Sequence, residues 1–390
     1  MTGVAISGVG MTEFRAAADA SILELAAAAA DRALADSRHS REEVASLHVS
    51  NALAESLGTR AGVANALASA IGVEGASADR IENTSASGAS ACHRGVEAVG
   101  AGGEGVALVV GVEKMSVRDT PDVTESISRL VHDREYRQGL TLPSFGGLAA
   151  GAYLDRYDAP RESLAAVAAK NHRNASANPF AQFQKAVTVE DALESPVVAD
   201  PLRLYDCCPM TDGAAAVVLS PEEGVPDEGS VSDGESVRVE GIGSATGTHA
   251  IAERDDPLAI ESVRTAGERA FDRAGLAVDD VDVACIHDAF TILELLELEE
   301  LGFYDPGTAW EATLDGETAL DGSLPVNPGG GLKARGHPLG ATGLSQIVEL
   351  VWQLRGDLPD ERQVPDPEVG FAINVAGFGN NSVCTVVRHG

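Results

Sequence analysis

The chain repeats one order of predicted elements twice: an apolar strand, a helix and a second apolar strand. The first copy has a strand at 4–9, an alanine-rich helix at 21–36 and a strand at 46–49; the second has 237–242, 258–274 and 283–286. Short apolar runs bounded by polar turns indicate buried strands, whereas longer periodic runs indicate helices. Because the order is the same in both copies, the sequence predicts two similar α/β halves.

Each copy continues into a glycine-flanked turn that opens a helix, and then into another buried strand. The turns lie at 85–88 and 337–343, and the strands at 106–112 and 371–375. Glycine and proline commonly mark such turns. Two halves of this kind, packed side by side, would bury a pair of helices between two sheets.

Residues 118–200 interrupt the pattern with charged and Pro/Asn-rich sequence, and we interpret them as an inserted loop domain. The N-terminal half is then formed by 1–117 together with 201–225, and the C-terminal half by 237–390. Between the halves, 226–236 is rich in acidic residues, Gly and Ser, which predicts a surface linker.

The formal charge of -32 comes from 60 acidic against 28 basic residues, and only four of the 28 are lysines (Lys114, Lys170, Lys185 and Lys333). Such a surface repels itself in dilute buffer, whereas molar salt shortens the Debye length to roughly 3 Å. We infer a salt-loaded cytoplasm, that of a halophile; the alternative is an ordinary acidic protein. In either case the charge argues against binding of nucleic acid.

The first residues lack a basic segment followed by a long apolar one, and no uninterrupted apolar stretch of about 18 residues appears later. A cytoplasmic protein outside the membrane is therefore expected. The cysteines are odd in number and show no Cys-x-x-Cys spacing, so neither a disulfide framework nor a metal site is predicted. They are Cys92, Cys207, Cys208, Cys285 and Cys384.

Four segments carry groups suited to acyl transfer: 83–88, 287–290, 336–343 and 377–380. They supply a serine at a helix start, two histidines and a glycine-rich turn. A nucleophile at Ser85 would gain from the partial positive charge of the helix N-terminus, but a serine needs an adjacent base, for which histidine is the obvious candidate.

Each of these residues also has a purely structural interpretation. Ser85 could be the N-cap of the helix that follows it. His337, between Gly336 and Pro338, could be a hydrogen-bonded histidine of a tight loop. His287 follows a predicted strand and precedes an acidic amphipathic helix, and it could simply be hydrogen-bonded at the strand end.

Read together, the segments resemble the thiolases, and most closely the sterol-carrier-protein-type thiolases and their archaeal relatives. The resemblance runs over nearly the whole length, in the segments 109–116, 171–173, 178–184, 207–216, 287–290 and 336–343. It implies the thiolase fold, a duplicated αβαβα five-layer α/β architecture with an inserted loop domain.

The resemblance also implies roles for the candidate residues. Ser85 stands where these enzymes carry the acylated cysteine, and His337 occupies the Gly-His-Pro position that activates the nucleophile. His287 begins the His-Asp-x-Phe motif, which takes over acid/base work from a second cysteine. The N–H groups of Ser85 and of the Gly377 turn would hold the oxyanion.

Neither of the usual catalytic cysteines is present. The region of the second one reads Ile373-Asn374-Val375-Ala376-Gly377-Phe378-Gly379, and Cys384 lies beyond it in a predicted core strand. Cys92 is about 10 Å along the helix from Ser85, too far to replace it. The two retained histidines favour an active enzyme.

The implied reaction is that of an acetyl-CoA C-acyltransferase, the Claisen condensation of two acyl-CoA molecules or the reverse thiolysis through an acyl-Ser85 intermediate. An oxyester is less activated than a thioester, which favours the biosynthetic direction, in polyhydroxyalkanoate or lipid metabolism. The alternatives are a related condensing enzyme, of the hydroxymethylglutaryl-CoA synthase or ketoacyl synthase kind, and a non-catalytic acyl-CoA-binding subunit. Coenzyme A thioesters are expected as substrates without a permanently bound cofactor. A homodimer or higher oligomer and a small OB-fold, zinc-ribbon partner are also expected.

Overall fold

The computed structural model describes residues 3–102, 105–222 and 236–390, so nearly all of the predicted linker at 226–236 lies outside the described residues. The strands are β1 (Val4–Met11), β2 (Val44–Ser50), β3 (Ser77–Ile81), β4 (Val106–Glu113), β5 (Val197–Ala199), β6 (Leu202–Arg203), β7 (Gly213–Pro221), β8 (Val237–Thr246), β9 (Val283–Cys285), β10 (Val369–Ala376) and β11 (Asn381–His389). The helices are α1 (Ile22–Asp36), α2 (Val63–Ile71), α3 (Ser87–Gly100), α4 (Thr120–Ser128), α5 (Asp133–Tyr136), α6 (Leu142–Tyr157), α7 (Glu162–Ser176), α8 (Val189–Glu194), α9 (Glu261–Ala274), α10 (Thr291–Glu300), α11 (Ala309–Leu314) and α12 (Leu339–Arg355).

The two predicted halves are present and have the same strand order. Across the described residues the order is β3-β2-β4-β7-β1 in the first half. Read from its outer edge, the second half has the order β9-β10-β11-β8, in which these strands correspond to β2, β4, β7 and β1. Val326 adds a single bridge beside β9, at the place that β3 takes in the first half. The duplication predicted from the sequence is therefore confirmed at the level of topology.

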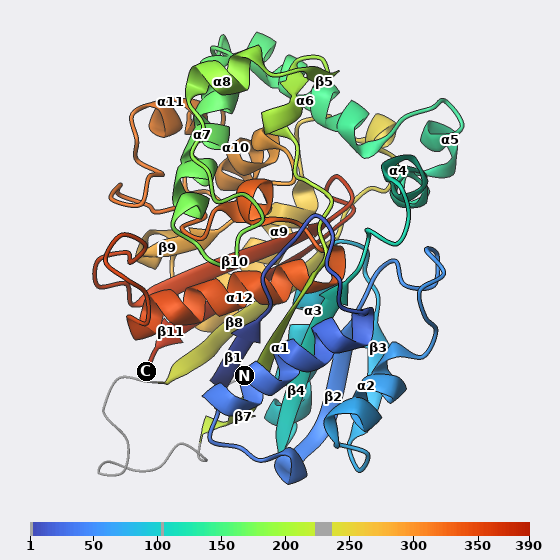
Figure 1. The fold of residues 1–390 in the computed structure, drawn as a ribbon. Coiled ribbons are helices and arrows are strands. Elements are labelled where there is room, and N and C mark those ends of the chain that lie inside the picture. Colours follow the sequence, from blue (N-terminus) through green and yellow to red (C-terminus); the bar gives the residue numbers. More distant parts are fainter. Residues whose placement is uncertain (1–2, 103–104, 223–235) are drawn as a thin grey trace.

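The sheets of the two halves join edge to edge. β1 and β8 pair antiparallel over Ala5–Arg238 and Ile6–Val237, which makes one continuous sheet. Figure 1 shows these two strands side by side in the middle of the molecule. The first strand of each half is an edge with unpaired N–H and C=O groups, and pairing the two edges satisfies some of them.

The helices α3 and α12 form the predicted buried pair and contact strands of both halves, whereas α1 and α9 cover the outer faces. The pair crosses at glycines: a Cβ on Gly88 would lie 2.9 Å from the backbone N of Gly343, and a Cβ on Gly343 would overlap the backbone N of Ala89. Because the two backbones touch there, the N-termini of both helices meet at one point. The loops that precede these helices, around Ser85 and His337, are brought together in this way.

The segment between β4 and β7 contributes α4 to α8 and the small β5–β6 pair, which lie together at one end of the molecule, shown in green in Figure 1. Its helices α6 and α7 pack against α10 of the second half. This contact overturns the prediction that an amphipathic helix follows His287, because Thr291–Glu299 is buried on every side. The buried Glu294 is paired with Lys170 of α7 at 2.6 Å, and Glu299 accepts a hydrogen bond from Tyr153 of α6.

None of the helices in the described ranges combines the length and the apolar character needed to cross a bilayer.

Candidate active site

One pocket of about 130 Å³ is lined by all four residues that the sequence singles out, Ser85, His287, His337 and Gly377. Each of them lies at the end of a regular element. Ser85 precedes α3, His287 follows β9, His337 precedes α12 and Gly377 follows β10. The structure thus brings the four side by side, while their chemical roles stay proposals.

Ser85 is held in a tight turn just ahead of α3. Thr84 has a positive φ of 46°, and the Ser87 hydroxyl donates to the Thr84 carbonyl at 2.6 Å while accepting from Asn83 N–H at 2.8 Å. The N-cap of α3 is Ala86, so the alternative reading of Ser85 as the helix cap is wrong. Its side chain lines the pocket instead.

His337 is buried, and its hydrogen bonds determine which of its two ring nitrogens carries the proton. Nδ1 lies 2.7 Å from the Thr342 hydroxyl, and that hydroxyl donates to the Pro338 carbonyl at 3.0 Å. Because the single hydroxyl proton is used on the carbonyl, Thr342 accepts from Nδ1–H. Nε2 is then left with a lone pair, as a general base requires.

His287 packs against His337 with a ring-centroid distance of 5.1 Å and an interplanar angle of 86°. Its backbone N–H donates to Glu297 at 2.9 Å, and its Nδ1 lies 3.0 Å from the Asn374 side-chain nitrogen. Burial lowers the pKa of His287 well below its ordinary value, with a further contribution from His337. Burial, followed by the charge of Arg335, lowers the pKa of His337 to about 3.

These lowered pKa values predict a flat pH dependence for acylation of the nucleophile. A histidine whose pKa falls from about 6.5 to about 3 keeps its lone pair as the pH drops through its usual titration range. The rate of acyl-enzyme formation is therefore expected to change less than about threefold between about pH 8 and about pH 5.5. Mass spectrometry of samples quenched at successive times measures this rate at each pH. A decline of the rate with an apparent pKa near 6.5 would contradict the lowered pKa of His337.

Gly377 lines the pocket with a positive φ of 62°, and a Cβ at this position would overlap the Asn380 side chain. Side chains from other parts of the chain donate hydrogen bonds to the two residues that follow Gly377 in this turn. Arg254 donates to the Phe378 carbonyl at 2.6 Å, and Ser262 donates to the Gly379 carbonyl at 2.8 Å. A turn fixed in this way suits an N–H group that must hold a developing charge without rearranging.

The sequence missed two cysteines of the pocket wall. Cys207 and Cys208 line the same pocket as Ser85, beside Pro209 and Met210. Burial raises the pKa of each thiol to about 12, so both are protonated at neutral pH and are weak nucleophiles. One sequence signal could have identified them: both cysteines lie in 207–216, one of the segments that resemble the thiolases.

The remaining wall is largely apolar and comes in part from the inserted segment. It is formed by Met115, Thr124, Ile127, Ser128, Leu142, Pro143, Ala289, Phe290 and Leu339. An apolar wall next to the two histidines excludes water from the site and suits an acyl group.

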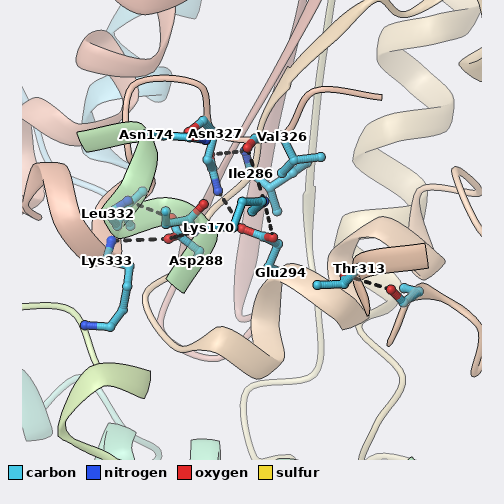
Figure 2. A network of polar contacts seen from close by, with 12 residues as sticks. Lys170, Asn174, Ile286, Asp288, Glu294, Thr313, Val326, Asn327, Leu332 and Lys333 are labelled. Atoms are coloured by element: carbon cyan, nitrogen blue, oxygen red, sulfur yellow. Dashed lines mark hydrogen bonds and ion pairs between the residues drawn. The ribbon is translucent and has the colours of Figure 1, made fainter. Parts of the chain in front are cut away.

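A buried polar network supports the segment that leads into His337 (Figure 2). Asp288 accepts from the backbone N–H of Leu332 at 2.6 Å and of Lys333 at 3.2 Å, in the π-helical turn Gly331–Arg335. Burial, followed by the nearby Glu294, raises the pKa of Asp288 to about 6.

The same network reaches the strand ahead of His287. Asn327 accepts from the Ile286 N–H at 3.0 Å and donates to Glu294 at 2.9 Å, and Lys170 holds both Glu294 and the Val326 carbonyl. Lys170 of α7 is therefore linked, through Glu294 and Asn327, to the backbone just ahead of His287.

Within the described part of the chain, no three His, Cys, Asp or Glu side chains gather in a way that could hold a metal ion. The expectation that the reaction uses no metal stays a prediction.

Comparison with known proteins places this geometry in a family. The sequence model of the family described as "Thiolase, N-terminal domain" matches residues 4–223, and that of "Thiolase C-terminal domain-like" matches residues 243–389. The acetyl-CoA acetyltransferase of Methanothermobacter thermautotrophicus is 39% identical over 384 residues, 98% of each chain. Sterol carrier protein 2 of Oryctolagus cuniculus is 31% identical over 99% of this chain and 72% of its own length.

Solved structures agree on the fold. The structure described as "Ltp2-ChsH2(DUF35) aldolase" has a TM-score of 0.82 at 24% sequence identity, covering 99% of this chain and 98% of the other. The two family matches and the archaeal and sterol-carrier-protein relatives confirm the resemblance seen in the motifs, and the chain belongs to the thiolase family.

Proposed function

We propose that the chain is an acetyl-CoA C-acyltransferase that forms or cleaves a carbon–carbon bond between acyl-CoA molecules. One observation carries the proposal: Ser85, His287 and His337 line a single pocket at the meeting point of two helix N-termini. The printed activity of the archaeal relative, acetyl-CoA acetyltransferase, supports the same reaction class. Coenzyme A thioesters are the substrates in this proposal, and no permanently bound cofactor takes part.

In the first stage His337 Nε2 takes the Ser85 hydroxyl proton while the oxygen attacks the thioester carbonyl. The N–H groups of Ser85 and of the Gly377 turn hold the oxyanion of the tetrahedral intermediate. The carbon–sulfur bond then breaks, and the coenzyme A thiolate takes the proton from His337. Ser85 is left as an oxyester, and His337 is neutral again.

In the second stage an α-proton leaves a second acyl-CoA, and the resulting carbanion attacks the acyl-Ser85 carbonyl. The carbon–carbon bond forms, the Ser85 oxygen–carbon bond breaks, and the proton returns to Ser85. The sequence assigned removal of the α-proton to His287, which lies in contact with His337. Thiolysis is the same sequence in reverse.

The experiment that tests this function is product analysis with acetyl-CoA as the only substrate. Acetoacetyl-CoA and free coenzyme A are the expected products. Release of a hydroxymethylglutaryl product on addition of acetoacetyl-CoA would favour the related condensing enzymes. Binding of acyl-CoA without any product, with and without a partner protein, would favour a non-catalytic subunit.

The chain's assembly and setting belong to the same proposal. We infer that the protein is cytoplasmic and forms a homodimer or higher oligomer. Each chain is divided into the two halves, the inserted domain and the linker predicted above. A small OB-fold, zinc-ribbon partner stays part of this proposal, and the printed name of one similar structure includes a second component, DUF35. Polyhydroxyalkanoate or lipid metabolism would use a 3-ketoacyl-CoA product.

The charge of -32 supports a halophilic setting, which makes a separate prediction about salt. Mutual repulsion of surface carboxylates is screened by molar salt, so the melting temperature is expected to rise by about 10 °C or more between about 0.1 M and about 2 M KCl. Differential scanning calorimetry measures it, with sucrose at equal osmolality as the control. An unchanged or lower melting temperature in KCl would contradict the halophilic setting.

A further inference from the structure

Asn374 is a buried amide near the C-terminal end of β10 whose only side-chain hydrogen bond among the described residues is to His287. Its Nδ2 lies 3.0 Å from His287 Nδ1, and its Oδ1 has no partner in the described residues. A buried polar group that leaves one of its atoms unpaired destabilises the fold. An amide kept at this cost points to a function at His287.

The surroundings decide which end of the amide faces the histidine. Asn374 Oδ1 and the backbone N of Ala89, a residue in the first turn of α3, both lie beside Gly343 of α12. The first N–H groups of a helix have no acceptors within the helix and carry a partial positive charge. They favour the carbonyl oxygen of the amide on that side, so the NH₂ group faces His287.

The consequence concerns the proton on the His287 ring. An NH₂ group can only donate, so His287 Nδ1 accepts, and the neutral ring carries its proton on Nε2. His337 is the opposite case, because Thr342 fixes its proton on Nδ1 and leaves Nε2 free. The two histidines of the pocket therefore present one N–H donor and one lone pair.

We propose that Asn374 is a positioning residue that holds His287 as a hydrogen-bond donor to the thioester oxygen of the second acyl-CoA. His337 is then the one base of the cycle: it takes the proton of Ser85, passes it to coenzyme A, and later takes the α-proton. His287 Nε2–H stabilises the enolate oxygen that forms. This inference rests on the proposed function and changes the role that the sequence assigned to His287.

Other groups that face His287 leave this assignment intact. Glu297 accepts the backbone N–H of His287, and burial raises its pKa well above the ordinary value, which favours a neutral carboxyl group. The thiols of Cys207 and Cys208 are protonated at neutral pH for the same reason. His337 is neutral as well, so the ring of His287 has no charged neighbour in the pocket that would draw a second proton onto it.

Asn374→Asp tests the proposal, because a carboxylate reverses the hydrogen bond. It accepts from His287 Nδ1–H, which leaves Nε2 without its proton at about pH 8, and kcat is expected to fall about 10²-fold with KM changed less than about threefold. Lowering the pH protonates His287, restores Nε2–H and is expected to recover kcat. A wild-type kcat at about pH 8, or a low kcat that does not recover on acidification, would overturn the role of Asn374.

A second pair of variants keeps the proposal testable if the buried aspartate prevents folding. In His287→Gln the side-chain NH₂ can still donate, so kcat is expected to stay within about tenfold of wild type, whereas His287→Leu is expected to lose about 10³-fold. Equal loss in both would mean that a base is needed and would overturn the donor role. Acetylation of wild-type Ser85 is measured in parallel: its absence overturns both proposals, and its presence confines any failure to Asn374 and His287.

Discussion

Ser85→Ala is expected to lower kcat at least about 10⁴-fold, because no other side chain takes over the acyl group. The two thiols that line the same pocket, those of Cys207 and Cys208, have pKa values raised to about 12 by burial. They are therefore protonated and poor nucleophiles at neutral pH. Steady-state formation of acetoacetyl-CoA measures the loss.

Two further variants separate the nucleophile from the turn that carries it. Ser90→Ala removes a hydroxyl one turn further along α3, where it accepts from Asn83, and is expected to keep kcat within about fivefold. Ser85→Cys restores the family's usual nucleophile and is expected to keep kcat within about tenfold. Wild-type activity in Ser85→Ala would refute the assignment of the nucleophile.

His337→Gln is expected to cost about 10³-fold in kcat, since the amide cannot take the serine proton. Serine, unlike cysteine, has almost no anionic fraction at neutral pH, so the loss should be larger here than in the Ser85→Cys background. Single-turnover acylation rates give the loss caused by His337→Gln in each background. The ratio of the two losses measures how much His337 contributes to activating Ser85. Equal losses in the two backgrounds would show that His337 does not activate Ser85.

His93→Gln is the matched control for that variant. His93 is also fully buried, bonded to a threonine hydroxyl at 3.1 Å, and burial lowers its pKa to about 3. It belongs to α3 but lines a different pocket from that of Ser85. Its replacement is expected to lower stability but leave the acylation rate of the folded enzyme within about threefold.

The fold was predictable where the apolar pattern is local and repeated. Short apolar runs identify β1, β2, β4, β8 and β10, because a buried strand needs only a few such residues bounded by turns. The pairing of β1 with β8 was not predictable, since it rests on two residue pairs between segments far apart in the chain. Hydrophobic periodicity carries no information about such a contact.

The burial of α10 shows a different limit. Its three inward glutamates give an amphipathic pattern that normally predicts one exposed face. They are buried because Lys170, Tyr153 and the backbone of His287 supply partners for them. Those partners lie on other elements, and a single sequence does not reveal which of its polar groups will meet.

The sequence singled out four residues that the structure brings into one pocket, but it did not indicate how they would divide the chemistry, and their roles stay proposals. Motifs place Ser85, His287, His337 and Gly377, and the pocket contains all four. The proton on each imidazole, however, is set by Thr342 and Asn374, which make no contact that spacing alone would reveal. The function of a histidine depends on the group that bonds its other nitrogen.

Acyl groups are expected to pass through an oxyester on Ser85. Mass spectrometry of the protein after brief incubation with acetyl-CoA, followed by digestion, tests it most directly. The expected result is one acetyl group on the peptide that contains Ser85, absent in Ser85→Ala and discharged when coenzyme A is added. Product formation with acetyl on the peptide of Cys207 and Cys208, or with no acetyl-enzyme at all, would contradict it.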